Sequence, residues 1–252
     1  MKAGKLLREK IIYLCPLFFC AAAWEISARL AETPLFPPLS AVLRQFYLLL
    51  FSGSLLLSHF AASLLRVMAG FMMGGVAGLL LGVLIGWNRA AEKVLSPLAG
   101  IFYPIPALGW LPLLMLWVGI NEMLPILIVF ICSFFPILYN TITGIKSVDP
   151  RYIKAARVLG ASDLQILWRV VLPLSLPNIF TGLKLEAGMA WRVIIAAEMV
   201  AIPTGIGVLM IKAESLIRVD IIMVCLLILS LMCLLFERIF HYLEAKFTCQ
   251  WR

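Results

Sequence analysis

The stretch AASLLRVMAGFMMGGVAGLLLGVLIGW, residues 61–87, decides what kind of fold this chain can adopt. It is long enough to cross the hydrocarbon core of a bilayer, which takes about 20 apolar residues in a helix. Because residues four apart lie on one face of a helix, its regularly spaced glycines predict a groove against which another membrane helix packs closely. A pore-lining or hinge role is the alternative. The glycines of this row are Gly70, Gly74, Gly78, Gly82 and Gly86.

The composition of the whole chain also indicates a membrane protein. Of its 252 residues, 63% are hydrophobic and 13% are charged, and the mean hydropathy is +1.04. A soluble domain has about 45–50% apolar and about 25% charged residues. Lipid offers the backbone no hydrogen-bond partners, so spanning segments are helices or closed barrels. The apolar runs are longer than the roughly ten residues of a barrel strand and do not alternate, so we expect an all-α fold.

The sequence predicts six transmembrane helices. They cover residues 11–30, 61–87, 98–119, 124–145, 176–202 and 219–240. The third contains Pro104, Pro106 and Pro112, and we expect one kinked span because neighbouring helices can satisfy the backbone groups that proline frees. We treat residues 1–252 as a single transmembrane domain, in which residues 1–59 hold the first span and an external segment, and residues 60–252 form the core.

The distribution of positive charge orients the chain. With the N-terminus inside, cytoplasmic segments hold most of the 21 Lys and Arg, whereas external segments and span ends hold only Arg29, Arg44, Lys212 and Arg218. The positive-inside rule therefore places both termini in the cytoplasm. The net charge of +8 lies along one membrane face, which disfavours nucleic-acid binding. The basic, apolar start is also typical of a secretory signal, but Glu25 and Arg29 predict an ion pair that continues the first span.

The longest polar passage lies between the fourth and fifth predicted spans, on the cytoplasmic side. Asp149 followed by Pro150 is typical of a helix start, with a capping carboxylate and a proline in the first turn. Residues 151–159 then form a short helix that ends near Gly160. Ser162 with Gln165 is typical of a capping box.

That capping box opens a second short helix over residues 163–171. Pro173 and Pro177 then predict a turn into the fifth span. The result is a helix–glycine–helix knob whose tip carries small residues, as suits insertion into a cleft of another protein. The alternative is a helix pair that lies on anionic lipid through basic side chains. The small residues are Ala155, Ala156 and Ala161, and the basic ones are Arg151, Lys154, Arg157 and Arg169.

This passage resembles the signature loop of permease subunits of bacterial ATP-binding-cassette importers, which reads roughly E-A-A, three residues, G, nine residues, I-x-L-P. Lys154 stands in the Glu place and Val170 in the Ile place. Within that superfamily the chain is similar to the nitrate/sulfonate/taurine type, with a type I importer fold. The matching positions are Ala155, Ala156, Gly160, Leu172 and Pro173, and further similar runs are FPPLSAVL (36–43), SLLRVMAGFMMGGVAGLLLGVLIG (63–86), YPIPALGWLPLLMLWVGI (103–120), FFPILYNTITGIKSVDP (134–150) and AAEMVAIPTGIGVLM (196–210).

The resemblance implies a multi-subunit machine in a bacterial inner membrane. Residues 149–172 would be a coupling segment that docks on cytoplasmic ATPase subunits, which bind ATP and Mg²⁺. Two copies of the chain would form the solute path, and a periplasmic or lipid-anchored binding protein would deliver the solute. Lys154 reverses the family's charge, so the family's salt bridge is not expected here. The docking residues implied are Lys154, Ala155, Ala156, Gly160, Ala161 and Ser162.

The sequence itself predicts neither ATP hydrolysis nor a cofactor in this chain. It contains no GxxxxGK[ST] phosphate loop and no HExxH metal pattern. A secondary transporter would carry an internal repeat with broken helices in both halves, yet the sixth predicted span has no counterpart to the prolines of the third. That class, and a permease of the same family for a vitamin precursor or other small solute, remain the alternatives.

The fifth predicted span carries the charges that bear on transport. Charged residues inside a membrane helix are functional candidates, and this span holds Lys184, Glu186, Arg192 and Glu198. A guanidinium binds nitrate, sulfonate or carboxylate through a planar fork, so Arg192 is the first candidate to contact a small anion. Lys184, Glu198 and Trp191 are further candidates for the path. The alternative is that these charges pair across the dimer.

The run AIPTGIGVLM, residues 201–210, follows the fifth predicted span on the external side. Its proline and glycines predict a re-entrant or loop element beneath the binding protein. We expect Gly205 and Gly207 to provide the freedom that its turns require.

Overall fold

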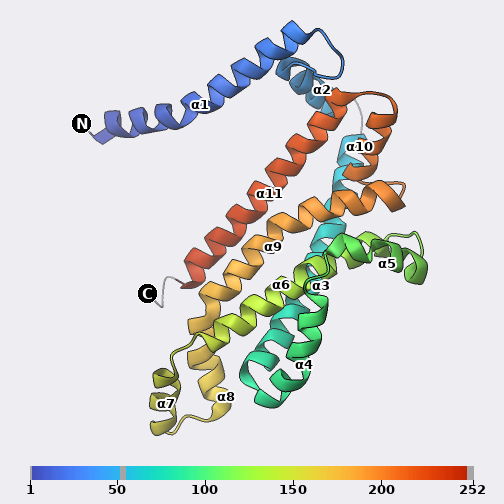
Figure 1. Cartoon of the computed structure of the whole chain (residues 1–252). Coiled ribbons are helices and arrows are strands. Elements are labelled where there is room, and N and C mark those ends of the chain that lie inside the picture. The colour runs from blue at the N-terminus through green and yellow to red at the C-terminus, as the bar shows by residue number, and fades with distance from the viewer. Residues whose placement is uncertain (1, 52–54, 249–252) are drawn as a thin grey trace.

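The computed structural model describes residues 2–51 and 55–248, and Figure 1 shows how their helices are arranged. Every element of this part is helical, which confirms the all-α prediction. The α-helices are α1 (Lys2–Ala31), α2 (Leu39–Phe51), α3 (Leu55–Trp87), α4 (Arg89–Phe102), α5 (Leu111–Val118), α6 (Met123–Lys146), α7 (Pro150–Val158), α8 (Asp163–Ile166), α9 (Leu172–Ala201), α10 (Ile206–Ser215) and α11 (Val219–Thr248). A 3-10 helix η1 (Ala107–Trp110) precedes α5, and a π-helix η2 (Leu167–Val171) precedes α9.

Among the described residues, four helical segments are long and apolar enough to cross a membrane: Leu55–Trp87, Met123–Lys146, Asp163–Val200 and Val219–Thr248. They coincide with the second, fourth, fifth and sixth predicted spans. The first predicted span lies within α1, which points away from the other helices (Figure 1). The total of six spans, like the placement of both termini in the cytoplasm, stays a prediction.

The row of glycines on α3 faces α6. A Cβ atom added at Gly74 would lie 2.6 Å from the carbonyl oxygen of Phe130, and one at Gly78 would lie 2.7 Å from that of Phe134. The two backbones therefore touch where no side chain intervenes, which is how small residues bring membrane helices together. Comparable close approaches to α6 occur at Gly70, Gly82 and Gly86.

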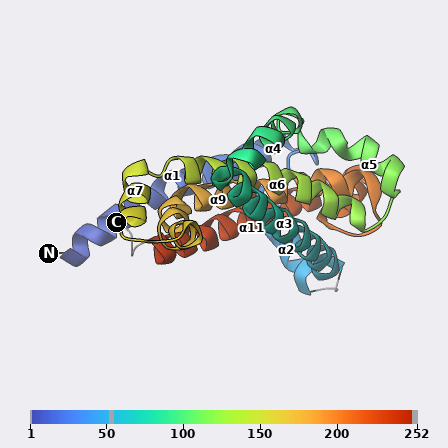
Figure 2. The same ribbon diagram turned by 90° about the horizontal axis from the view of Figure 1, so that it is seen from below.

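Glycines also bring α6 and α9 together. A Cβ at Gly182 of α9 would lie 2.8 Å from the Cβ of Asn140, and one at Gly144 of α6 would lie 3.0 Å from that of Asn178. Seen from below, α6, α9 and α11 run alongside one another and α3 crosses them obliquely (Figure 2). Helix α6 is thus the central element, with α3 on one side and α9 on the other.

The prediction of a kink within one helix over residues 98–119 is wrong in form, because the structure has a break there, whereas the crossing of the two pieces as one span stays a prediction. Helix α4 begins earlier, at Arg89, where Asn88 Oδ1 accepts hydrogen bonds from the next helical N–H groups. It ends at Phe102, and η1 with α5 continues at an angle of 84° to it. Pro104 and Pro106 fall in the break, where their fixed φ and missing N–H groups prevent the helix from continuing. The sequence shows the interruption but not its angle.

The predicted turn at Pro173 and Pro177 is also wrong, because α8, η2 and α9 form one continuous helical segment. Pro173 lies in the first turn of α9, immediately after η2, where the N–H of Leu172 reaches back five residues to the carbonyl of Leu167. A π-helical turn accommodates local strain in this way. Ser175 Oγ donates to the carbonyl of Val171, the last residue of η2, at 2.5 Å.

The end of α1 is tied to the start of α2. Trp24 Nε1 donates to the carbonyl of Pro37 at 3.2 Å, and the Glu25 carboxylate accepts from both the N–H and the Oγ of Ser40, at 3.0 and 2.8 Å. Arg29 Nη2 lies 2.7 Å from Glu25 Oε1, which confirms the predicted ion pair.

Because α3 and α6 are in close contact, adding one methyl group to a glycine of the row on α3 should cost more stability than adding it to a glycine with open surroundings. Gly78→Ala should lower the free energy of unfolding by about 1–3 kcal/mol, because the added Cβ forces the helices apart. Gly188→Ala makes the same change within α9, where a Cβ would meet nothing within 4 Å, and should shift stability by less than about 0.5 kcal/mol. Thermal unfolding in detergent measures both, and equal losses would contradict the role assigned to the glycine row.

Candidate functional site

Helices α7 and α8 form a hairpin that projects from one end of the bundle (Figure 1). Asp149 Oδ1 accepts from the N–H of Arg151 at 2.8 Å, which confirms the predicted start of α7. Gly160 follows the helix with φ +82°, a value that favours glycine. Ser162 and Gln165 form the predicted capping box, in which each side chain accepts from the backbone N–H of the other.

The two short helices of the hairpin are held to each other and to the bundle. Arg157 Nη2 donates to Asp163 Oδ1 at 2.9 Å and links α7 to α8. The base of the hairpin packs into a buried apolar cluster that includes Ile145, Ile166 and Val171, from α6, α8 and η2. The hairpin therefore has a fixed position relative to the long helices α6 and α9.

The tip of the hairpin exposes large apolar side chains in an otherwise polar passage. Val158 and Leu159 are 87% and 86% exposed, and Leu164 and Trp168 are also exposed. An exposed apolar patch with a polar surround is typical of a surface that binds another protein. Of the residues expected to dock, Ala156 and Ala161 are half-buried, and the rest are exposed: Lys154, Ala155, Gly160 and Ser162.

A cavity of about 570 Å³ lies beside α9 and α11. This volume is within the usual range of small-molecule sites, about 300–1,000 Å³. Lys184 and Arg192, two of the candidates for the solute path, both line it. Lys184 Nζ is paired with Glu244 Oε2 of α11 at 2.6 Å, whereas Arg192 has no carboxylate oxygen within 4.0 Å among the described residues. The other polar residues of the lining are Thr181, Glu186, Glu237 and His241.

Glu198 and Trp191, the other two candidates for the path, do not reach this cavity. Both side chains are fully buried. Trp191 packs edge-on against Phe236 of α11, with ring centroids 5.5 Å apart, and lies parallel to Phe60 of α3. Lys184 and Arg192 therefore line the same cavity, whereas Trp191 and Glu198 lie in the interior of the bundle.

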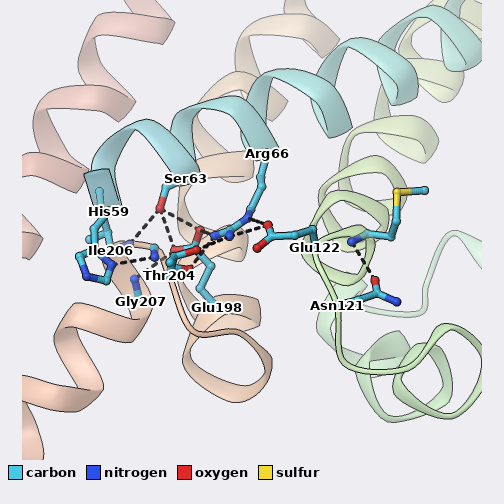
Figure 3. A network of polar contacts seen from close by, with 11 residues as sticks. His59, Ser63, Arg66, Asn121, Glu122, Glu198, Thr204, Ile206 and Gly207 are labelled. Carbon is cyan, nitrogen blue, oxygen red and sulfur yellow. Dashed lines mark hydrogen bonds and ion pairs between the residues drawn. The ribbon is translucent and has the colours of Figure 1, made fainter. Parts of the chain in front are cut away.

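Glu198 belongs instead to a network of polar contacts at the end of the bundle opposite the hairpin, which we call the Arg66 network (Figure 3). Arg66 of α3 is only 4% exposed. Its Nη1 atom donates to Glu198 Oε1 at 2.8 Å and to the carbonyl of Thr204 at 2.7 Å, and its Nη2 atom donates to Thr204 Oγ1 at 2.7 Å. On the other side, its Nε atom donates to Glu122 Oε2 at 2.6 Å.

The Arg66 network also caps α10. The backbone N–H groups of residues 205–207 donate, in order, to His59 Nδ1 at 2.8 Å, Ser63 Oγ at 2.9 Å and Glu198 Oε2 at 3.1 Å. Ser63 Oγ in turn donates to the Glu198 carboxylate at 2.8 Å. The first N–H groups of a helix have no partner within it, and here side chains of α3 and α9 satisfy them.

Comparison with known proteins settles the family. Residues 74–248 match the family model described as "Binding-protein-dependent transport system inner membrane component". The chain belongs to this family. It is 38% identical to a putative ABC transporter permease protein of Methanocaldococcus jannaschii, over 97% of this chain and 93% of that protein. It is 32% identical to the taurine transport system permease protein of Escherichia coli, over 89% of this chain and 84% of that protein.

The fold of this permease is also found among solved structures. It is similar to a chain of the MetNI methionine ABC transporter, with a TM-score of 0.58 and 19% sequence identity, covering 77% of this chain and 95% of that chain. The predicted likeness to the nitrate/sulfonate/taurine type of ABC importer permease and to its fold is therefore confirmed. The chain is a multi-pass membrane permease.

Residues 201–210, which were expected to form a re-entrant or loop element, differ in part from that prediction. Gly205 has φ +129° and makes the turn, as expected. Gly207, however, lies inside α10, where an added Cβ would collide with the carbonyl oxygen of Ile195 and lie 2.8 Å from the Cβ of Glu198. Gly207 therefore permits close packing of α10 on α9, and most of the expected loop is helix.

The sequence analysis missed Arg66 as a structural centre of the permease. The available signal was a lone arginine within an apolar run, together with Glu198 in another span. Their separation of 132 positions gives no local pattern that would pair them. No three His, Cys, Asp or Glu side chains in the described part of the permease are grouped so that they could hold a metal ion.

Burial of the Arg66–Glu198 pair predicts a large loss of stability when one partner is removed. Arg66→Met leaves Glu198 buried without its counter-ion, which should cost about 3–5 kcal/mol of the free energy of unfolding. Arg29→Met breaks the exposed pair with Glu25 and should cost less than about 1 kcal/mol. Thermal unfolding of the purified permease compares the two variants, and a similar small loss in both would show that Glu198 does not depend on Arg66.

Proposed function

We propose that two copies of this permease enclose a solute path and that the hairpin couples them to separate ATPase subunits. Charges on the long apolar helices support pairing of copies. Arg192 and Glu237 are exposed on α9 and α11. Charged side chains that face hydrocarbon are expensive, so this face is better suited to a second copy or to water than to lipid.

The observation that carries coupling is the hairpin with its exposed apolar tip. Its caps, the Arg157–Asp163 pair and its packed base hold it in one orientation. A rigid projection with Val158 and Leu159 at its end suits insertion into a groove of the ATPase. ATP and Mg²⁺ then bind to that partner, and closure of the ATPases moves α6 and α9 through the hairpin.

The solute proposed for this path is a small anion such as nitrate, a sulfonate or taurine. Arg192 supports an anion because it lines the cavity without a carboxylate partner among the described residues. The similarity to a permease named for taurine supports the same class. A binding protein outside the membrane, soluble or lipid-anchored, would deliver this anion to the end of the bundle that carries α10.

Affinity purification from the native membrane tests the assembly. We expect a Walker-motif ATPase and a second, differently tagged copy of the permease to co-purify in mild detergent and to be identified by mass spectrometry. A permease that is folded and inserted but repeatedly lacks an ATPase would contradict the coupling role and favour a stand-alone carrier. An accompanying binding protein would identify the solute through its own ligand.

Gly160→Asp should uncouple the hairpin from the ATPase. The added charge lies at the docking surface, while a Cβ there meets nothing within 4 Å inside the chain. We expect loss of the ATPase during purification and at least tenfold slower uptake, with normal insertion. Gly119→Asp is the matched control, because Gly119 also has a positive φ and open surroundings but lies between α5 and α6. Normal uptake by Gly160→Asp would argue strongly against docking at this position.

Arg192→Gln should reduce uptake without affecting assembly. A hydrogen-bonded charge contributes about 1.5–3 kcal/mol, which corresponds to roughly 10–100-fold in apparent affinity for the anion. Uptake measured over a range of anion concentrations should therefore show a raised KM with the ATPase still bound. Lys184→Gln serves as a comparison, because that lysine is already paired with Glu244 and should have a smaller effect. An unchanged KM in Arg192→Gln would exclude contact with the solute.

A further inference from the structure

Arg66 is shared between two surroundings that differ sharply in exposure. On one side are Glu198, which is fully buried, and the backbone and hydroxyl of Thr204. On the other side is Glu122, whose side chain is 61% exposed and lies 2.5 Å from Arg66 Nη2. One guanidinium therefore joins the turn between α5 and α6 to the segment that begins α10 (Figure 3).

The buried half of the Arg66 network is built to stay closed. Separation of Arg66 from Glu198 would leave a buried charge without a partner, at a cost of several kcal/mol. It would also disturb the caps that Ser63 and Glu198 provide for the N–H groups of residues 206 and 207. The carboxylate lies at the N-terminus of α10, where negative charge is favourable. Helix α10 is thus fixed to α3 and α9.

The exposed half can open at a lower cost than the buried half. Glu122 precedes α6, yet its carboxylate caps no N–H group of that helix. Asn121 does this instead, because its Oδ1 accepts from the N–H of Met123 at 2.9 Å. A released Glu122 would become hydrated, and Arg66 would still be paired with Glu198 and Thr204, so this opening costs less than separation of the buried pair. The turn between α5 and α6 keeps the Asn121 cap whether or not Glu122 contacts Arg66, but without that contact nothing in the Arg66 network holds the turn in place.

We propose that Glu122 and Arg66 are positioning residues of the transport cycle, and that their contact opens and re-forms in each cycle while Arg66–Glu198 stays closed. The proposal rests on the transport function proposed above. Glu198, which contacts Arg66, lies about 40 Å along α9 from Leu172, the residue at which that helix begins on the hairpin side, since 26 steps of 1.5 Å separate the two residues. Movement of the hairpin would reach the Glu122–Arg66 contact through α6 and α9, and the turn at Glu122 would separate from α10 when that end of the path opens.

A reversible cross-link tests whether separation is required. Glu122 Oε2 and Thr204 Oγ1 both lie within 2.7 Å of Arg66 Nη2, so a short bis-methanethiosulfonate should join the thiols of a Glu122→Cys/Thr204→Cys double variant. The linked permease should take up anion at least tenfold more slowly than the same variant before linking, and reduction should restore its rate. Each single-cysteine variant, treated alike, should show no such reversible loss.

The possible results are distinct. Thiols that cannot be linked would show that the two segments do not meet, and full uptake by linked protein would show that they need not separate. Either result overturns the proposal while the uptake itself supports the transport function. If the unmodified permease with its partners transports no anion, the proposed function fails. A measurement that does not depend on transport then shows whether the buried and exposed halves of the Arg66 network behave independently.

Amide hydrogen exchange on the purified permease provides that measurement. Glu122→Gln should raise exchange at least threefold in residues 119–124 and leave residues 205–207 unchanged, because their acceptors are His59, Ser63 and Glu198. Equal increases in both segments would show one rigid unit and overturn the proposal.

In transport, Glu122→Gln should lower the maximal rate about three- to tenfold with KM unchanged, and Glu122→Asp should recover most of that rate. A changed KM with a normal maximal rate would indicate a binding role instead.

Discussion

The contact between the backbones of α3 and α6 is the constraint on which the rest of the permease depends. Lipid is as apolar as the helices, so burial of leucine or valine gives no strong reason for two membrane helices to associate. Contact at van der Waals distance along Gly74 and Gly78 supplies it, and similar contacts through Gly144 and Gly182 place α9 against the other side of α6. The hairpin and the Arg66 network take their positions from these three helices.

Close packing also explains where charge can be buried. Arg66 and Glu198 face each other across the packed helices, and each hydrogen-bonding site of the guanidinium is directed at a carboxylate or at Thr204. Such a pair adds little net stability compared with apolar packing, but it permits few alternative arrangements once formed. The glycines supply the attraction between helices, and the charges specify one alignment of α10 with α3 and α9.

Local signals were sufficient to predict much of the permease. Apolar length gave four of the long helical segments, and glycine spacing indicated the packed face of α3. Asp149 and the Ser162–Gln165 pair gave the hairpin. Features that depend on distant partners were not predictable, among them the Arg66–Glu198 pair and the 84° break after α4. Arg192 and Glu198 were grouped as path candidates, and only the packing of α9 shows that one lines a cavity while the other is interior.

The π-helical turn η2 has a geometric consequence for the whole of α9. A π-helical turn holds one residue more than the α-helical turn it replaces, so the directions of side chains before and after it are out of phase with a regular α-helix. A helical wheel drawn without interruption from Asp163 to Val200 would misplace the later residues by about 100° relative to the earlier ones. The exposed apolar face of the hairpin and the face of α9 that lines the cavity are therefore set relative to each other by this one extra residue.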